Sequence, residues 1–255
     1  MLKKRLVGVI TVKDGRAVQS FGYGRHLPLG TAQCLAENLD RWGADEILVL
    51  CIDRSRRGLG PDLALLRQLG SLGLSTPLSF GGGIRTAADA AAVIQSGAER
   101  VCLDALLRTN PAVVGEISTH IGAQAVIGVL PLAFADGTLQ WLDYLSGRST
   151  PLSVANLALF ASRTVSEALV IDWRNEGRAG GFDERLVRHF PLAQVPLIAF
   201  GGVSEAAQLD TLLAHDQVVA VGSGNFLAYR EHAVQKLRQR SSARSLRSPI
   251  FGSEG

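Results

Sequence analysis

The chain repeats part of its own sequence once, at an offset of about 120 residues, and this repeat limits its fold more than any other feature. Pro77–Ile84 (PLSFGGGI) is matched 119 residues later by Pro196–Val203 (PLIAFGGV). Upstream segments match at an offset of 121, among them Asp45–Val49 and Ser166–Val170. A single period shared by several matched segments indicates two similar structural units that complete one core, not two independent domains.

Apolar segments alternate with segments of helical periodicity along the whole chain. The apolar runs are rich in Val, Ile and Leu, which is typical of strands buried on both faces of a parallel sheet. The expected strands are Leu6–Val12, Glu46–Ile52, Thr76–Phe80, Arg100–Leu103, Ala125–Leu130, Ala168–Ile171, Pro196–Phe200 and Val218–Val221. The expected helices are Ala32–Trp42, Asp62–Leu72, Ala87–Ser96, Pro111–His120, Ser153–Ser162, Asp183–His189, Glu205–Leu213 and Tyr229–Leu237. Eight strand–helix units predict an α/β fold, a single (β/α)8 TIM barrel built of two half-barrel repeats.

The excess positive charge of the chain is concentrated near its C-terminus. The net charge is +3, and Lys236, Arg238, Arg240, Arg244 and Arg247 together contribute more than this excess. The remaining body is close to neutral, which gives no reason to expect a nucleic-acid partner. We expect the barrel to cover residues 1–238 and a basic, Ser/Arg-rich, flexible tail to cover residues 239–255.

Cysteine and histidine usage argues against a metal site. The three cysteines are too few and too scattered for a disulfide framework, and the five histidines show no ligand spacing. The apolar run Leu6–Val12 is too short to span a membrane and lacks a signal-peptide cleavage site. We therefore expect a cytoplasmic protein with no metal, no cofactor and no membrane association.

Glycine clusters follow the third and seventh expected strands, where backbone N–H groups at a helix N-terminus bind phosphate well. Two cradles related by the repeat would hold a ligand with a phosphate at each end. The first-half cradle comprises Gly82, Gly83 and Asp104, and the second-half cradle comprises Gly177, Gly202, Gly222 and Ser223. Asp104 counts against the first-half cradle, because a carboxylate repels phosphate.

Five segments resemble the HisF family, the cyclase subunit of imidazole glycerol phosphate synthase. They are Met1–Arg5, Val12–Arg16, Phe80–Thr86, Gly122–Val126 and Ile198–Gly202. The resemblance extends to about residue 237. It implies a lyase of histidine biosynthesis, a phosphorylated ribonucleotide substrate, no metal, and a HisH-like glutaminase partner on the N-terminal face that sends ammonia through the barrel.

The sequence departs from that family at the two aspartates that act there as general acid and base. The corresponding positions are Thr11 and Pro131. Neither side chain transfers a proton near neutral pH, which argues against ordinary cyclase activity. Four carboxylates near strand ends could act instead: Asp53, Asp104, Asp172 and Glu176. Asp53 and Asp172 are the better candidates, because they fall at the ends of expected barrel strands.

The opposite end of the barrel keeps a charge pattern of the resembled family. That family gates ammonia entry with a ring of four charged residues, and the matching positions are Arg5, Glu46, Arg100 and Glu167. Charges at strand starts also cap barrels through ordinary salt bridges, so the ring alone leaves both interpretations open. Glu99 matches an acidic position that contacts the glutaminase in the family.

Three functions remain open at this stage. The first is a synthase subunit that uses ammonia from a glutamine amidotransferase on a phosphorylated ribonucleotide or a sugar nucleotide. Ile52–Asp53, Gly58–Asp62 and Gly222–Ser223 are similar to a diverged branch of the family that supports sugar amidation in surface-polysaccharide biosynthesis. The second is a HisA-like aldose–ketose isomerase, and the third is a catalytically inert, ammonia-conducting scaffold.

Overall fold

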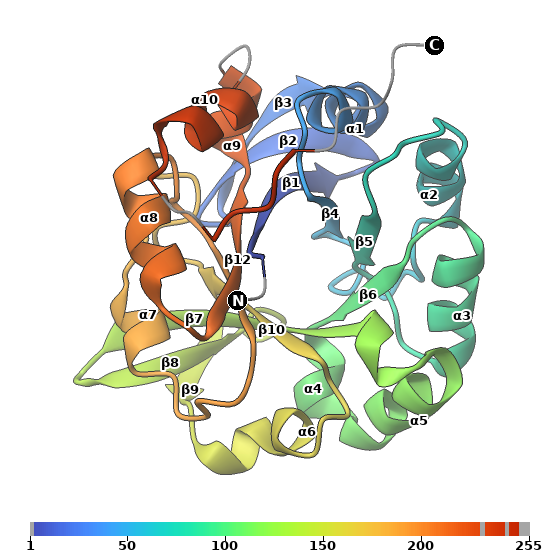
Figure 1. Ribbon diagram of the computed structural model, residues 1–255. Helices are drawn as coiled ribbons and strands as arrows, with labels where there is room; N and C mark the ends of the chain where they lie inside the picture. The colour runs from blue at the N-terminus through green and yellow to red at the C-terminus, as the bar shows by residue number, and fades with distance from the viewer. Residues whose placement is uncertain (1–2, 230–232, 243–244, 250–255) are drawn as a thin grey trace.

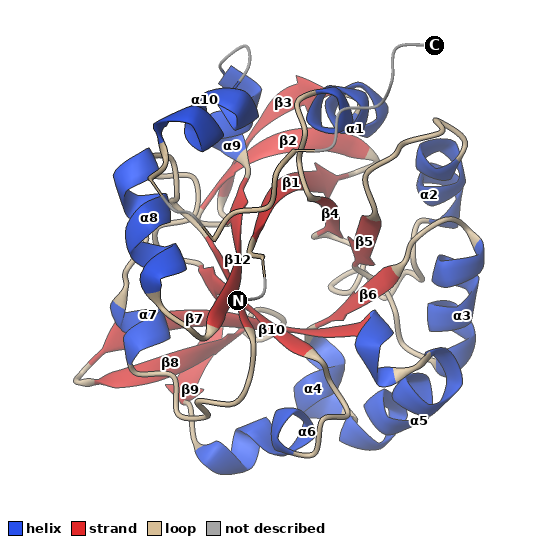
Figure 2. Cartoon of the chain, in the orientation of Figure 1, coloured by secondary structure: helices blue, strands red, loops and turns tan. Residues whose placement is uncertain are grey.

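Eight parallel strands close into a barrel, and helices surround it (Figures 1 and 2). The structure is a computed structural model that describes residues 3–229, 233–242 and 245–249. In order around the barrel the strands are β1 (Arg5–Lys13), β4 (Glu46–Cys51), β5 (Leu78–Gly81), β6 (Arg100–Leu103), β7 (Val126–Ala135), β10 (Glu167–Asp172), β11 (Leu197–Phe200) and β12 (Val218–Ser223). Because β12 pairs with β1 and β7 pairs with β10, the eight-stranded barrel is closed. The expected (β/α)8 barrel is confirmed, and each expected strand overlaps one barrel strand.

The helices lie outside the strands. They are α1 (Ala32–Arg41), α2 (Leu63–Gly70), α3 (Ala87–Gln95), α4 (Ala105–Thr109), α5 (Pro111–Ile121), α6 (Ala158–Ala161), α7 (Arg185–Arg188), α8 (Ala206–Ala214), α9 (Asn225–Tyr229) and α10 (Ala233–Arg240). Local signals fix several starts: Thr86 and Asp89 form a capping box on α3, and Asn110 caps α5 just before Pro111. Helices α6 and α7 are shorter than expected, and residues 230–232 of the expected last helix lie outside the described residues.

Each half-barrel also carries an antiparallel extension that the periodicity analysis missed. Strands β2 (Arg16–Phe21) and β3 (Arg25–Gly30) follow β1, whereas β8 (Thr138–Asp143) and β9 (Arg148–Pro151) follow β7. The turns that start the two extensions are Asp-Gly pairs with positive φ at both residues, 50° and 73° in the first and 52° and 73° in the second. An Asp-Gly pair between strands is a strong hairpin signal, so the sequence did contain the information.

The two half-barrels have nearly the same backbone at their glycine loops. Gly82 and Gly83 have φ values of 115° and 79°, and the matching Gly201 and Gly202 have 109° and 87°. Such φ values favour glycine. Both loops follow the C-terminal ends of barrel strands, β5 and β11, so both open on the C-terminal face as expected.

Apolar side chains fill the inside of the barrel. Val7, Leu48, Ile127, Leu169 and Ile198 belong to one buried interior cluster. A second, larger cluster lies between the strands and the helices. The interior is therefore a packed core, as in other (β/α)8 barrels, and a chemical site must lie at one of its two ends.

The segment after α10 lies against the N-terminal face, in front of β1 in Figure 1. The N–H of Lys4 donates to Ser245 O at 2.7 Å, and the N–H of Arg247 donates to Lys4 O at 3.0 Å. Arg238 donates to Arg247 O at 2.7 Å. Helix α10 continues to Arg240 and so crosses the expected boundary at residue 238. The tail is thus hydrogen-bonded to the barrel at these points; its residues 243–244 and 250–255 lie outside the described residues.

Candidate functional site

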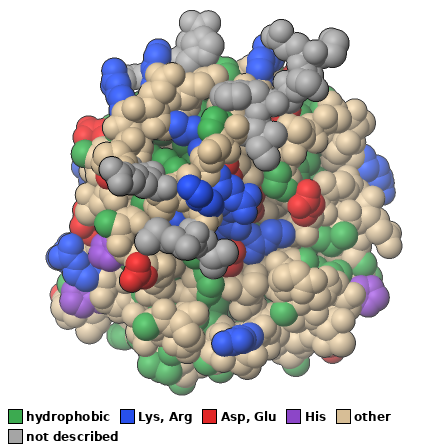
Figure 3. Space-filling view, in the orientation of Figure 1, with side chains coloured by type: hydrophobic (Ala, Val, Ile, Leu, Met, Phe, Trp, Pro, Cys, Tyr) green, Lys and Arg blue, Asp and Glu red, His purple; other side chains and the backbone are tan. Residues whose placement is uncertain are grey.

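The four residues of the charged ring meet at the N-terminal mouth of the barrel. Arg5 lies 2.6 Å from Glu167 and 3.6 Å from Glu46, and Arg100 lies 3.0 Å from Glu167 and 3.7 Å from Glu46. Figure 3 shows basic and acidic side chains gathered at the centre of this face. Each charge therefore has two opposite neighbours, and the ring is closed and neutral.

Neighbouring serine side chains hydrogen-bond to the ring, and the ion pairs within it favour the charged forms of Arg5 and Glu167. Ser79 donates to Glu46, which is only 4% exposed, and Arg100 donates to Ser166 at 3.1 Å. Burial disfavours the charge of Glu167, but Arg100 and Arg5 outweigh it and lower the pKa of that carboxyl. Burial also opposes the charge of Arg5, and Glu167 and Glu46 nevertheless raise its pKa. Arg5 and Glu167 therefore keep their charges at neutral pH.

Glu99 lies next to Arg100, at the start of β6, and is exposed. Its backbone N–H donates to Leu78 O at 2.8 Å, which fixes the main chain beside the ring. The position is accessible to a partner on this face.

A cavity of about 810 Å³ opens on the C-terminal face. Its volume is in the range typical of small-molecule sites. The residues that line it come mostly from the ends of β1, β4, β5, β6, β7 and β10 and from the loops that follow them. This is the end of the barrel where enzymes of this fold place their chemistry.

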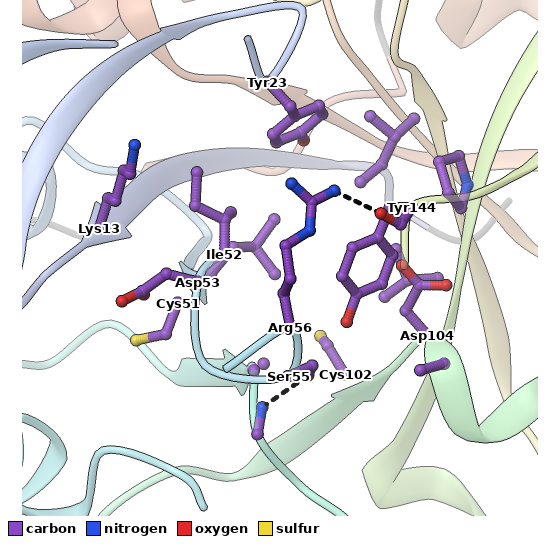
Figure 4. Close-up of a pocket in the computed structure, with 18 of the residues that line it drawn as sticks. Lys13, Tyr23, Cys51, Ile52, Asp53, Ser55, Arg56, Cys102, Asp104 and Tyr144 are labelled. Atoms are coloured by element: carbon purple, nitrogen blue, oxygen red, sulfur yellow. Dashed lines mark hydrogen bonds between the residues drawn. The ribbon is translucent and has the colours of Figure 1, made fainter. Parts of the chain in front are cut away.

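One wall of the cavity carries linked charges from the loops after β1 and β4. Arg57 lies 2.6 Å from Asp14 and 3.1 Å from Asp53, and Asp53 also accepts the N–H of Asp14 at 3.3 Å. Arg56 extends across the cavity and donates to the backbone oxygen of Tyr144 (Figure 4). Asp53, expected as a catalytic candidate, therefore lines the cavity as an ion-paired carboxylate.

Asp104 lies on the opposite wall, below Tyr144 in Figure 4. It precedes α4 but makes no side-chain capping hydrogen bond. Burial raises the pKa of Asp104 to about 8; Arg108 opposes this rise and Asp143 adds to it. A carboxyl that is largely protonated at pH 7 does not repel phosphate as a carboxylate would, so the objection to Asp104 in the first-half cradle loses most of its weight.

The glycines of the first-half cradle line the cavity. The N–H of Gly83 donates to Ser55 Oγ at 3.1 Å, as the dashed line in Figure 4 shows. A Cβ on Gly82 would lie 2.2 Å from Cys51 O, and one on Gly83 2.5 Å from Gly60 O. Only glycine fits these two positions, and the backbone consequently lies at the cavity surface.

The second-half cradle does not reach this cavity. None of its four residues is among those that line it. Ser223 is 1% exposed and donates its hydroxyl to Val203 O at 3.0 Å. A Cβ on Gly177 would lie 2.3 Å from Ser20 O. The second-half residues therefore lie outside the lining of this cavity, whereas Gly82, Gly83 and Asp104 belong to it.

Asp172 also lies outside the cavity lining. Its carboxylate accepts the N–H of Asn175 at 3.2 Å, the side-chain amide of Asn175 at 2.8 Å and the N–H of Asp183 at 2.8 Å. These bonds hold the loop between β10 and α7. The geometry gives Asp172 a structural use, so Asp53 is the candidate of the two that faces a ligand site.

The sequence analysis matched Thr11 and Pro131 to the two aspartates of the resembled family. Pro131 lines the cavity, and Thr11 is buried on β1, two residues before the cavity residue Lys13. Cys51 and Cys102 also line the cavity, but burial raises the pKa of both thiols, so neither is a nucleophile at neutral pH.

The sequence analysis assigned no site role to several cavity residues. Lys13, Tyr23, Arg56, Tyr144 and Trp173 all line the cavity. Tyr144 stands in the turn between β8 and β9, so its position depends on a hairpin that was not expected. The signal that could have found them is shared: each follows or ends a barrel strand, or lies in one of the two Asp-Gly-started extensions.

Two general properties follow from the described part of the chain. No group of three or more His, Cys, Asp or Glu side chains in it is arranged to hold a metal ion. None of its helices is both long enough and apolar enough to cross a membrane.

Comparison with known proteins gives a consistent result. The family described as "Histidine biosynthesis protein" matches residues 5–232. Three similar proteins are named imidazole glycerol phosphate synthase subunit HisF. The one from Lysinibacillus sphaericus (strain C3-41) is 28% identical over 244 residues, which are 94% of this chain and 96% of that protein. The one from Anoxybacillus flavithermus (strain DSM 21510 / WK1) is 27% identical over 243 residues, 94% and 96% of the two chains. The one from Staphylococcus carnosus (strain TM300) is 29% identical over 224 residues, 86% and 88%.

Proposed function

The chain belongs to the histidine biosynthesis protein family, and on this premise we propose that it is a HisF-like synthase subunit that receives ammonia from a glutamine amidotransferase. The amidotransferase would dock on the N-terminal face, and ammonia would pass the charged ring toward a phosphorylated substrate in the C-terminal cavity. The substrate is a ribonucleotide or a sugar nucleotide. The free cysteines fit a reducing cytoplasm.

The observation that carries this proposal is the closed geometry of the charged ring. Two arginines and two glutamates, from strands far apart in sequence, meet at the barrel mouth with all four pairs within 3.7 Å. A buried arrangement of this kind is not a strong source of stability, because desolvation offsets most of the Coulombic gain. A neutral, polar mouth at the end of an apolar interior suits the entry of a small polar molecule such as ammonia.

The cavity supports an enzymatic role over an inert scaffold. Its opposite walls hold two carboxyls in different environments, Asp53 ion-paired with Arg57 and Asp104 buried with a raised pKa. Two carboxyls whose environments differ in this way are typical of acid–base sites. The scaffold alternative is supported by Thr11 and Pro131, which remove the proton-transfer groups that the resembled family uses.

The test is glutamine hydrolysis by a glutaminase encoded beside this chain, measured with and without the purified protein. We expect the two proteins to co-purify and the hydrolysis to be stimulated. The variants Arg5→Ala and Glu167→Ala should lose the stimulation. Arg188→Ala is the matched control, because it removes an arginine from an exposed pair with Glu184 on α7, away from the ring. A monomeric protein with no effect on any glutaminase of its genome would contradict the proposal.

A further inference from the structure

Arg56 reaches across the C-terminal cavity from the loop after β4 to the turn between β8 and β9 (Figure 4). Its guanidinium donates to the backbone oxygen of Tyr144. Among the described residues it pairs with no carboxylate, and the guanidinium is exposed rather than packed away. Because a guanidinium is always charged and carries several N–H donors, one neutral carbonyl leaves most of its binding capacity unused.

The next residue in the same loop shows the opposite arrangement. Arg57 also lines the cavity, but it lies 2.6 Å from Asp14 and 3.1 Å from Asp53. Two carboxylates of the protein therefore neutralise Arg57, whereas no carboxylate of the described residues neutralises Arg56. The pairing accounts for Arg57 as part of the cavity wall, and the charge of Arg56 has no such account.

The ionisable side chains that line the cavity leave an excess of positive charge at neutral pH. Lys13, like Arg56, has no carboxylate partner among the described residues; its Nζ lies 3.4 Å from Nδ1 of His26. Burial and the nearby Lys13 lower the pKa of His26, so the imidazole is neutral. Burial raises the pKa of Asp104 to about 8, so this carboxyl is largely protonated at pH 7. A cavity with this balance of charge favours an anionic ligand.

The same cavity is lined by two residues with unused hydrogen-bond donors. The Tyr23 hydroxyl and Trp173 Nε1 are buried, and neither has a hydrogen-bond partner among the described residues. Burial raises the pKa of the Tyr23 phenol, which therefore stays protonated, and an indole N–H can only donate. Buried donors without acceptors are unfavourable, so this lining suits a ligand rich in acceptor oxygens.

We propose that Arg56 is a specificity-determining residue that binds an oxyanion of the ligand, a phosphoryl or a carboxylate group, in the C-terminal cavity. The oxyanion would replace the Tyr144 carbonyl as acceptor, because a hydrogen bond from a guanidinium to an anion is about twice as strong as one between neutral groups. The turn would stay in place, since the Tyr144 side chain also hydrogen-bonds to Ser55. The inference rests on the proposed function only in placing the substrate in this cavity.

The experiment is a titration of the full chain with sodium phosphate and, separately, with sodium acetate. Sodium chloride keeps the ionic strength constant, so that general screening does not change during the titration. The Nε–H group of Arg56 and the backbone amide of Tyr144 are followed by 1H–15N NMR. We expect at least one anion to shift both signals saturably, and the anion that does so at the lower concentration identifies the group. If neither anion shifts the Arg56 signal, the inference is wrong.

Two variants of one loop separate direct contact from a general effect of charge. Arg56→Gln and Arg57→Gln remove the same charge from neighbouring positions. Arg56→Gln should weaken anion binding, read at the Tyr144 amide, by about tenfold or more, because it removes charged hydrogen bonds to the ligand. Arg57→Gln should weaken it by about threefold or less, because it changes only the surrounding field. Equal losses in the two variants would overturn the inference.

A purely structural role for Arg56, as a link between two loops, predicts a different result. Arg56→Gln would then lower the urea midpoint of unfolding and leave anion affinity unchanged, which would contradict the proposal. If Arg56→Gln fails to fold, Arg56→Lys decides, because it keeps the charge and loses the planar fork. We expect Arg56→Lys to bind the anion several-fold more weakly, and unchanged affinity would count against the proposal. None of these titrations involves a glutaminase, so a failed partner test and a failed anion test are distinguishable.

Discussion

The two ends of the barrel treat charge in opposite ways. At the N-terminal mouth, Arg5, Glu46, Arg100 and Glu167 neutralise one another completely. In the C-terminal cavity, the side chain of Asp104 has no hydrogen bond or ion pair among the described residues, and burial raises its pKa. A group left in such a state costs stability and is typical of a functional site. The charges of the N-terminal mouth are thus satisfied within the protein. The C-terminal cavity holds a carboxyl that a ligand could satisfy.

The mouth and the cavity also differ in how closely they match the resembled family. The resemblance matches the mouth to a charged ring in which a lysine stands where this chain has Arg100, and it matches Thr11 and Pro131 to two aspartates. The cavity is lined by Asp53 and Asp104 and by the aromatic side chains Tyr23, Tyr144 and Trp173. We propose that the mouth has diverged less from the family than the cavity has.

The largest expected effect concerns the lost aspartates. The unmodified chain should show little ring closure on the phosphorylated ribonucleotide of the resembled family, because each missing proton-transfer group costs about 10²–10⁴ in rate. The double variant Thr11→Asp, Pro131→Asp should gain activity with free ammonia. Turnover by the unmodified chain at a rate ordinary for this class would contradict the comparison, since the cavity would then not have changed its chemistry.

The second-largest expected effect is the loss of stability when the charged ring is broken. Glu167→Ala removes the nearest partner of both Arg5 and Arg100, at 2.6 and 3.0 Å, and leaves two arginines poorly compensated. We expect a loss of about 3 kcal/mol in the free energy of unfolding, measured in urea. The control Glu184→Ala, which removes a partly exposed carboxylate, should lose about 0.5 kcal/mol or less. A loss at Glu167 no larger than in the control would mean that the ring is not a coupled unit.

The sequence predicts the N-terminal mouth better than the C-terminal cavity, and the reason is physical. The ring was implied by the family resemblance, and its four residues meet in the structure because they sit at strand starts, which parallel strands bring to one rim. The strands themselves were predictable from continuous apolar runs. Neither inference required knowledge of a loop.

The cavity could be predicted only in part. The first-half glycines were found, because an unusual backbone demands glycine at Gly82 and Gly83. The contact between Glu176 and the hairpin turn at Tyr23 was not found, because the two residues lie 153 positions apart in the chain. Side-chain contacts between two long loops leave no periodic signal in a sequence.

A smaller effect of opposite sign is expected at Asp104. Its folded pKa of about 8 lies above the ordinary value, so the folded state holds a proton that the unfolded state has lost. Stability should therefore fall as pH rises from about 4 to about 8 and then level off. Asp104→Asn should remove this dependence and stabilise the protein by about 1–2 kcal/mol at pH 9, since solvent at the cavity screens part of the effect.

The measurement is urea unfolding at pH 5, 7 and 9, with the midpoint of the Asp104 carboxyl followed directly by 13C NMR. Asp53→Asn is the contrasting variant, because Asp53 is paired with Arg57 and its removal should not stabilise the protein. A titration midpoint near pH 4 for Asp104 would contradict this prediction. It would also remove the contrast between the paired charges of the mouth and the unpaired carboxyl of the cavity.

The smallest expected effect comes from a substitution that keeps the charge at one ring position but changes the side-chain geometry. Arg100→Lys keeps the positive charge between Glu46 and Glu167 but loses the bond from the guanidinium to Ser166 at 3.1 Å. Since arginine and lysine differ in geometry more than in charge, we expect a loss of about 0.5–1 kcal/mol in unfolding free energy. Stimulation of the glutaminase should persist, because lysine stands at this position in the resembled family. If the variant stays folded but the stimulation disappears, the function of the mouth depends on the guanidinium of Arg100. The mouth would then also have diverged from the resembled family, and the contrast between the mouth and the cavity would be lost.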